Sequence, residues 1–225
     1  MHKSIALLVA ISFIAFSQLN AQVMIGFRSG VHAAANNLTF DLEFQEYARR
    51  ERITSLTVGI PVEWPAGRML SFHSGLQIQR MGTRVVKVDR SRGFEDWLAT
   101  QYNITYLSIP SLAKLSLPMG RLQVFILGGI NFHYGIDLEN STYSYTDGGI
   151  NERWKMDFAR ASIRRYDASL ALGAGLQTQI SEGKIIFVDF RTSTGLLDID
   201  TRDSEAYNQA FEITLGMLLP MRKRS

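Results

Sequence analysis

The chain of 225 residues carries 24 Lys and Arg against 21 Asp and Glu, and it contains no cysteine. Without cysteine, a disulfide framework, thiolate catalysis and cysteine-bound metal are excluded. A formal net charge of +3 is too small to indicate nucleic-acid binding, and the length fits a single domain.

The first 21 residues have the features of a secretory signal peptide. Lys3 provides the positive start, "SIALLVAISFIAF" the apolar stretch and "SQLNA" a small-residue exit that ends at Ala21. The apolar stretch is shorter than the roughly 20 residues that a membrane-spanning helix needs, and no later segment reaches that length. We therefore expect export, with residues 1–21 removed and 22–225 forming one mature domain.

Eight segments of the mature chain alternate between apolar residues and polar or small ones, which is the pattern of β-strands. In the sixth, Leu170, Leu172 and Leu176 lie on one face, while Asp167 and Gln177 lie on the other. In chain order the segments are "QVMIGFRSGVH" (22–32), "SLTVGIPVEW" (55–64), "LSFHSGLQIQ" (70–79), "YLSIPSLAKLSL" (106–117), "LQVFILGGINFHYGID" (122–137), "YDASLALGAGLQTQI" (166–180), "KIIFVDFRTSTGLL" (184–197) and "AFEITLGMLLPM" (210–221).

Short and long connections alternate along the chain. The short ones are Gly-containing turns at 65–68, 118–121 and 181–184, and the long polar ones are expected at roughly 33–52, 83–101, 138–164 and 198–206. Outer-membrane barrels have this asymmetry, with tight periplasmic turns and longer extracellular loops. An even number of strands places both termini on the periplasmic side.

A soluble, lipocalin-like barrel would also alternate, but with its apolar face inward. Here the polar face is rich in glycine, which suits a narrow interior better than a solvent-exposed coat. The segments are also long enough to cross the hydrocarbon, and Trp64, Tyr102, Tyr106 and Tyr134 lie near strand ends, where an interfacial belt is expected. We predict an eight-stranded antiparallel up-and-down transmembrane β-barrel, closed because an open edge in lipid leaves backbone groups unpaired.

Several of these segments resemble the PorT-like outer-membrane β-barrel family. The resemblance covers nearly all of the mature chain and lies in "YLSIPSLAKLSL" with the following Gly turn and "VFILGGINFHYG", and in "IGFRSGV", "SGLQIQRMG" and "ALGAGLQ". It implies an eight-strand barrel in the outer membrane of a Gram-negative bacterium. For some family members it also implies a role in secretion or gliding machinery of the type IX kind.

The predicted inward face collects charged and imidazole side chains. Because an unpaired buried charge costs several kcal/mol, we expect them to pair as a structural network that plugs the barrel, with a proton or ion path as the alternative. His73 and His133, with Asp137, are considered as metal ligands, but hydrogen-bonded histidines are the commoner arrangement, and no metal or other cofactor is expected. The predicted lumen network is Arg28, Glu63, His73, Lys114, His133, Asp167, Asp189, Arg191 and Glu212.

Two other groups of residues lie towards the long loops. Tyr143, Tyr145, Arg153 and Trp154 could bind a partner, since exposed aromatics and Arg are common in binding hot spots; the alternative is a solvated loop whose Trp154 and Phe158 fold back on the rim. For an enzyme, His32 lies near the outer rim, with Asp41 and Glu43 close in sequence, yet nothing marks a nucleophile.

The sequence therefore favours a non-enzymatic outer-membrane barrel with a structural or partner-binding role and no nucleic-acid partner. The alternatives are an accessory component of a secretion system, an outer-membrane enzyme that modifies lipid or peptide, and a soluble ligand-binding barrel.

Overall fold

The computed structural model describes residues 22–36, 48–89, 96–144, 149–159, 161–201 and 206–221, so the predicted signal peptide lies outside the described residues. Within these ranges, no helix has the length and apolar content needed to cross a membrane. Most of the described chain is strand, apart from a single 3-10 turn, η2 (Ser181–Gly183). The strands are β1 (Met24–Asn36), β2 (Ala48–Pro65), β3 (Leu70–Asp89), β4 (Asp96–Met119), β5 (Leu122–Ser144), β6 (Gly149–Lys155), β7 (Tyr166–Gln179), β8 (Ile185–Gly195) and β9 (Asn208–Pro220).

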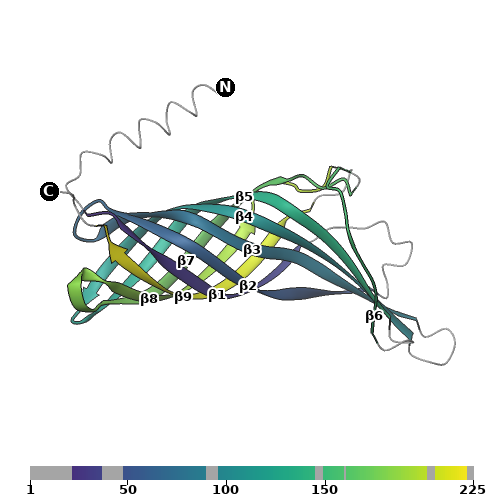
Figure 1. The fold of residues 1–225 in the computed structure, drawn as a ribbon, viewed down its shortest axis with the longest axis horizontal. Coiled ribbons are helices and arrows are strands. Elements are labelled where there is room, and N and C mark those ends of the chain that lie inside the picture. The colour runs from purple at the N-terminus through teal and green to yellow at the C-terminus, as the bar shows by residue number, and fades with distance from the viewer. Residues whose placement is uncertain are drawn as a thin grey trace, which may run out of the picture.

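The sheet closes on itself as an antiparallel barrel (Figure 1). β9 pairs with β1 along the whole length of both strands, and β4 pairs with β5. One edge of β5 is shared, because residues 122–134 pair with β7 and residues 139–144 pair with β6. β6 and β7 thus take the place of one strand, and the predicted eight-stranded barrel is confirmed.

The short turns predicted at 65–68, 118–121 and 181–184 all join neighbouring strands, and they gather at the left end of the barrel in Figure 1, where β1 begins and β9 ends. In outer-membrane barrels this end faces the periplasm. At the other end, β2, β3, β4 and β5 extend well beyond β7, β8 and β9, so one wall of the barrel is much taller than the other.

The predicted facing of the strands is confirmed. Phe27, Leu172 and Leu215 are 56%, 56% and 65% exposed on the outside, whereas Arg28 and Asp189 are each 2% exposed on the inside. Apolar side chains therefore face the hydrocarbon, and the soluble barrel with its apolar face inward is ruled out.

Large and small residues face each other inside the barrel. Phe125 pairs with Gly175 and Phe187 with Gly216 on neighbouring strands. A Cβ atom added at Gly175 would lie 2.4 Å from Phe125 Cζ, and one at Gly216 would lie 2.3 Å from Phe187 Cζ. Backbone carbonyl oxygens are as restrictive, with Val188 O at 2.3 Å from the added atom at Gly175 and Phe27 O at 2.7 Å at Gly216, so ring and backbone together require glycine at both positions.

The predicted bounds are wrong for three of the long loops. In place of the predicted loop 33–52, residues 33–36 belong to β1 and residues 48–52 to β2. Residues 83–89 pair with 96–102, and residues 98–103 pair in turn with 139–144, so both stretches are strand. Outside the hydrocarbon, neither face of the sheet has to be apolar, and the alternation that marks a strand is lost. Tyr106 is also wrongly assigned to an interfacial belt, since it points inward and is 0% exposed. Tyr134 does lie outside, 5.2 Å from the ring of Tyr166.

Candidate functional site in the barrel interior

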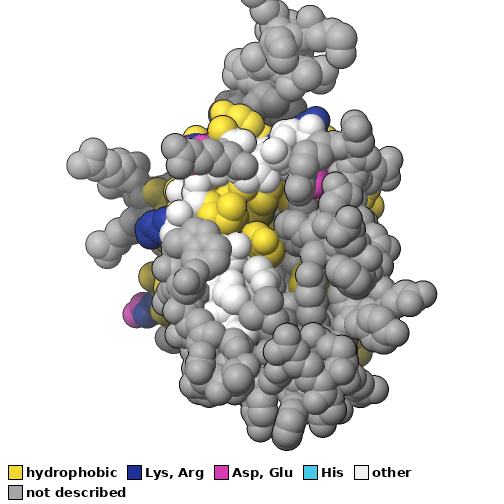
Figure 2. Space-filling view, turned by 90° about the vertical axis from the view of Figure 1, so that its right-hand side faces the viewer, with side chains coloured by type: hydrophobic (Ala, Val, Ile, Leu, Met, Phe, Trp, Pro, Cys, Tyr) yellow, Lys and Arg dark blue, Asp and Glu magenta, His cyan; other side chains and the backbone are white. Residues whose placement is uncertain are grey.

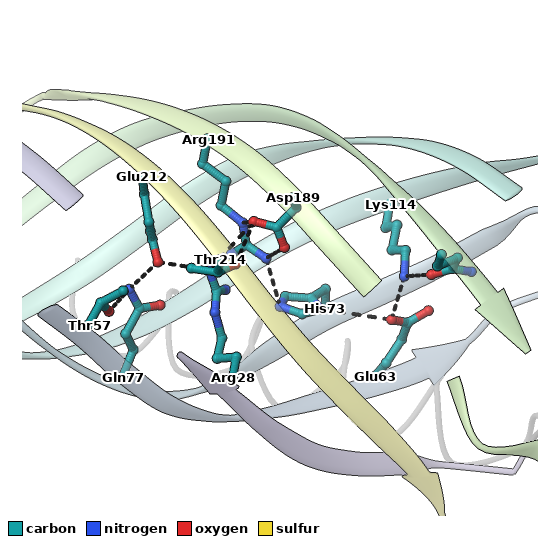
Figure 3. Close-up of polar contacts among 11 residues, drawn as sticks. Arg28, Thr57, Glu63, His73, Gln77, Lys114, Asp189, Arg191, Glu212 and Thr214 are labelled. Atoms are coloured by element: carbon teal, nitrogen blue, oxygen red, sulfur yellow. Dashed lines mark hydrogen bonds and ion pairs between the residues drawn. The ribbon is translucent and has the colours of Figure 1, made fainter. Parts of the chain in front are cut away.

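Arg28, Asp189 and Arg191 form the centre of a polar network inside the barrel (Figure 3). Arg191 donates to both carboxylate oxygens of Asp189, with Nε–Oδ1 at 3.0 Å and Nη2–Oδ2 at 2.9 Å. Arg28 Nη2 lies 3.6 Å from Asp189 Oδ1 and donates to Glu212 Oε1 at 2.8 Å. Thr214 Oγ1 accepts from Arg28 at 2.9 Å and donates to Asp189 Oδ1 at 2.9 Å.

Strand pairing places these side chains together. On β8 and β9, Asp189 pairs with Thr214 and Arg191 with Glu212. Each strand contributes two residues at a spacing of two, so all four side chains point inward. Arg28 reaches them from β1, which is the next strand beyond β9.

A second ion pair lies closer to the short turns. Lys114 Nζ donates to Glu63 Oε2 at 2.8 Å and to Gln177 Oε1 at 2.5 Å. Ser71 Oγ donates to the other oxygen of Glu63 at 2.8 Å, and Gln177 Nε2 donates to Gln123 Oε1 at 2.6 Å. Lys114 and Glu63 are about as buried as the central cluster, so this pair too lies away from bulk solvent.

His73 lies between the two clusters. Its Nε2 atom is 3.3 Å from Arg191 Nη2, and its Nδ1 atom is 3.8 Å from Glu63 Oε2. Three cations and three carboxylates therefore share one network and balance in formal charge: Arg28, Lys114 and Arg191 with Glu63, Asp189 and Glu212.

Neutral groups continue the network towards the taller end. Gln77 Nε2 lies 2.9 Å from Glu212 Oε1 and 2.9 Å from Gln79 Oε1, and the Gln79 amide lies 3.2 Å from His133 Nδ1. The two ring nitrogens of His133 also contact hydroxyls, of Ser108 at 2.7 Å and of Ser169 at 2.9 Å.

Asp167 does not join this network. Its Oδ2 atom accepts from Asn208 Nδ2 at 2.7 Å, and its Oδ1 atom accepts from the backbone amide of Ala168 at 2.7 Å. No described Lys or Arg forms an ion pair with this carboxylate. The structure thus brings eight of the nine predicted lumen residues into one set of contacts and leaves Asp167 beside it.

An apolar cluster covers the network at the taller end. Two stretches of described residues fold over the opening: 156–159 with 161–165, and 196–201 with 206–207. There Arg164 N donates to Ile199 O at 2.8 Å and Thr201 N to Ser162 O at 2.9 Å. Figure 2 looks onto this end and shows hydrophobic side chains at its centre. The cluster consists of Ala34, Met81, Ile104, Tyr106, Leu138, Phe158, Ile163, Ile199, Ala206 and Ala210.

A second apolar cluster fills the interior towards the short turns. Lys114 Nζ lies 4.4 Å from the centre of the Phe125 ring, so this cluster borders directly on the charged groups. The space enclosed between Lys114, His73, Arg191 and Phe187 leaves no cavity large enough for a water molecule. The cluster consists of Met24, Leu112, Phe125, Leu127, Ala171, Phe187 and Leu218.

The histidines do not form a metal centre. His73 and His133 contact different partners, and the structure places Asp137 outside the barrel, where its Oδ1 atom lies 3.1 Å from Lys155 Nζ. A register shift between Thr105 and Tyr106 puts Asp137 out of phase with the alternation that predicts it inside. Among the described residues, no three His, Asp or Glu side chains gather as metal ligands would.

The residues considered for an enzyme or a partner site are only partly described. His32 points into the barrel from β1, is 1% exposed and contacts Ser55 Oγ through Nδ1 at 2.9 Å. The ring of Tyr143 packs beneath the guanidinium of Arg84, with 5.2 Å between the ring centre and Arg84 Cζ. Asp41, Glu43 and Tyr145, and the side chains of Arg153 and Trp154, lie outside the described part of the chain.

A closed antiparallel barrel of eight long strands, apolar outside and charged inside, defines a transmembrane β-barrel of the outer-membrane type. The model of the family described as "Outer membrane protein beta-barrel domain" matches residues 16–201. The chain belongs to this family and is located in the outer membrane.

Solved structures of similar shape include several bacterial outer-membrane proteins. Neisserial surface protein A shares 9% identity at a TM-score of 0.46, covering 88% of this chain and 97% of its own. The outer membrane protein OprG from Pseudomonas aeruginosa shares 10% identity at a TM-score of 0.41, and the match covers 89% of this chain and 97% of OprG. The outer membrane protease OmpT from Escherichia coli shares 12% identity at a TM-score of 0.42, and the match covers 92% of this chain and 100% of OmpT. At these low identities and TM-scores, no function of these proteins can be assigned to this chain. No curated protein sequence matches the chain significantly.

Proposed function

We propose that this protein is a non-enzymatic outer-membrane barrel with a structural or partner-binding role, and that its own side chains plug its interior. The observation that carries this proposal is the charge-balanced network enclosed between two apolar clusters. Interiors of eight-stranded barrels are just wide enough for side chains to fill.

Physical chemistry favours the plug over an ion or proton path. Removing a partner from a buried ion pair costs several kcal/mol, so ions passing through would have to break pairs that hold one another in place. The chain of hydrogen bonds that starts at Gln123 ends at His133. The next described contacts, of Asn208 with Asp167 and Tyr106, lie against the apolar cluster at the taller end and share no hydrogen bond with that chain, which leaves a gap between the two sets. A hydrogen-bonded path across the barrel would need polar groups or water in this gap.

The same burial argues against catalysis. His133 contacts the hydroxyls of Ser108 and Ser169, which is the pairing of base and nucleophile that hydrolases use. However, all three side chains are at most 4% exposed and lie beneath the apolar cluster, where neither lipid nor peptide has access.

A partner would then have to bind at the taller end or along the outer wall. The extension of β2–β5 carries Arg84 and Tyr143 on one face, beside the segment that contains Arg153 and Trp154. Arg and aromatic residues dominate binding hot spots. An accessory role in secretion, and membership of the PorT-like branch, are suggested by the sequence resemblance; loss of protein export on deletion of the gene would support that role.

Single-channel recording on the purified protein in planar bilayers tests the plug. We expect no stable conductance steps, while a sixteen-stranded porin measured in parallel gives them. Steady, ohmic currents from the wild-type chain would overturn the proposal.

We also propose that residues 1–21 are removed on export. Intact mass and N-terminal sequencing of protein extracted from the outer membrane should begin at Gln22. A mature protein that still carries residues 1–21 would contradict this.

A further inference from the structure

Among the described residues, the outer wall of the barrel carries an open groove near the short-turn end. It has a volume of about 240 Å³. Its apolar side chains belong to β5, β7, β8 and β9 and are 40–65% exposed in the bare protein. The residues that form its outward surface are Leu122, Leu176, Thr178, Ile186, Val188 and Leu215.

The groove exists because a small residue lies among large ones. Thr178 pairs with Leu122 on one side and with Ile186 on the other. Its short side chain leaves a depression that the longer neighbours surround. Leu122 is the first residue of β5, and Ile186 is the second residue of β8, so the depression lies beside the turns. In an outer-membrane barrel this is the level of the inner, periplasmic leaflet.

Two cationic residues lie in the turns beside the groove. Arg121 immediately precedes Leu122, and its carbonyl oxygen accepts from Thr178 Oγ1 at 2.9 Å, which ties this turn to the floor of the groove. The Arg121 side chain is exposed and has no ion pair with a described residue. Lys184, in the turn between β7 and β8, pairs among the described residues only with the exposed Glu182 at 2.9 Å, and such surface pairs are weak.

We propose that this groove binds an anionic phospholipid of the inner leaflet. An acyl chain fills the apolar depression, and the guanidinium of Arg121 binds the phosphate, assisted by Lys184. Arginine is suited to this because its planar fork can donate two parallel hydrogen bonds to a phosphate. The groove thus offers an apolar surface to the acyl chain and cationic side chains to the headgroup, at the membrane depth where a phospholipid of this leaflet has both. Lipopolysaccharide lies in the opposite leaflet and does not fit the position.

Native mass spectrometry of the purified full-length barrel, titrated with phosphatidylglycerol in detergent, tests the site. We expect one phosphatidylglycerol to remain bound under activation that strips phosphatidylcholine. Arg121→Gln should weaken this binding about tenfold, the loss of one charge-assisted contact. Thr178→Trp should abolish it by filling the groove, while Trp at the membrane interface is compatible with folding.

The matched control is Arg68→Gln, which removes an exposed arginine from the turn between β2 and β3, away from the groove. Heat-modifiable gel migration confirms that each variant is folded. If Arg121→Gln and Thr178→Trp retain phosphatidylglycerol as well as Arg68→Gln does, the bound lipid is only annular and the proposal is overturned. Equal retention of phosphatidylcholine by the wild type would overturn the preference for an anionic headgroup.

Discussion

Lys114 Nζ and Glu63 Oε2 lie 2.8 Å apart inside the barrel, although their strands, β4 and β2, are separated by β3. The two side chains are 3% and 6% exposed. The ion pair therefore connects strands that share no backbone hydrogen bonds. Contacts of this kind fix the shape of the interior in a way that strand pairing alone does not.

Breaking this pair should destabilise the barrel strongly. In Lys114→Met, the carboxylate of Glu63 keeps only the hydroxyl of Ser71 and the distant imidazole of His73 as partners. We expect a loss of about 3–5 kcal/mol in the free energy of unfolding, because a buried charge is left unpaired. Urea titration of protein refolded into lipid vesicles measures it.

The double variant Lys114→Met/Glu63→Gln should recover much of this loss, since no buried charge then remains alone. Lys155→Met is the control, because Lys155 forms an exposed pair with Asp137 and should change stability by at most about 1 kcal/mol. Equal effects of Lys114→Met and Lys155→Met would contradict the assignment of Lys114 to a buried network.

The sequence predicts the facing of the strands well, because hydrocarbon imposes a strict period of two on any strand that crosses it. Arg28, Asp189 and Arg191 can be assigned to the interior from their neighbours alone. The partners of these residues cannot be assigned in the same way. Which strands lie opposite each other across the lumen depends on the register of all eight strands, and no single segment specifies it.

The apolar residues of the interior are also missed by the periodicity. Phe125 and Phe187 lie in "VFILGG" and "IIFVDF", where both faces of the strand are apolar and the alternation is hidden. The signal that could have identified them is the glycine across the sheet, Gly175 and Gly216, since a large inward side chain needs a small one opposite. The register shift at Tyr106, which moves Asp137 outside, leaves no such signal.

An arginine on the lipid-facing wall should cost more at mid-membrane than near the turns. Leu172 lies at the centre of β7 and is 56% exposed, whereas Met119 is the last residue of β4 and is 65% exposed. We expect Leu172→Arg to lose about 2–4 kcal/mol and Met119→Arg about 0–1 kcal/mol. The measurement is again urea unfolding in lipid vesicles. If Met119→Arg proves as costly as Leu172→Arg, the assignment of membrane depth is wrong.

Filling the space opposite an inward phenylalanine should strain the barrel. In Gly216→Leu, the new Cβ would lie 2.3 Å from Phe187 Cζ and 2.7 Å from the carbonyl oxygen of Phe27. We expect a loss of about 1–3 kcal/mol, as for other overpacked cores, and partial recovery in Gly216→Leu/Phe187→Ala. Gly67→Ala is the control, because a Cβ there meets no atom within 4 Å. Full stability of Gly216→Leu in the same unfolding assay would show that the ring does not occupy this place.

The apolar cluster at the taller end should open locally when its central ring is removed. Phe158 is 4% exposed, and the guanidinium Cζ of Arg165 lies 4.9 Å from the centre of its ring. Phe158→Ala should therefore release residues 156–159 and 161–165. Among the described residues, backbone bonds such as Gly135 N to Arg165 O at 2.7 Å and Met156 N to Leu138 O at 2.9 Å hold this stretch to the barrel. We expect faster amide hydrogen exchange in these residues and unchanged protection of β7, since local unfolding requires far less free energy than opening the sheet. Phe132→Ala is the matched control, because Phe132 is 52% exposed towards lipid and touches neither segment that folds over the opening. Unchanged hydrogen exchange in residues 156–159 and 161–165 after Phe158→Ala would mean that the Phe158 ring does not hold them over the barrel opening. The charged network alone would then have to block ion flow through the interior.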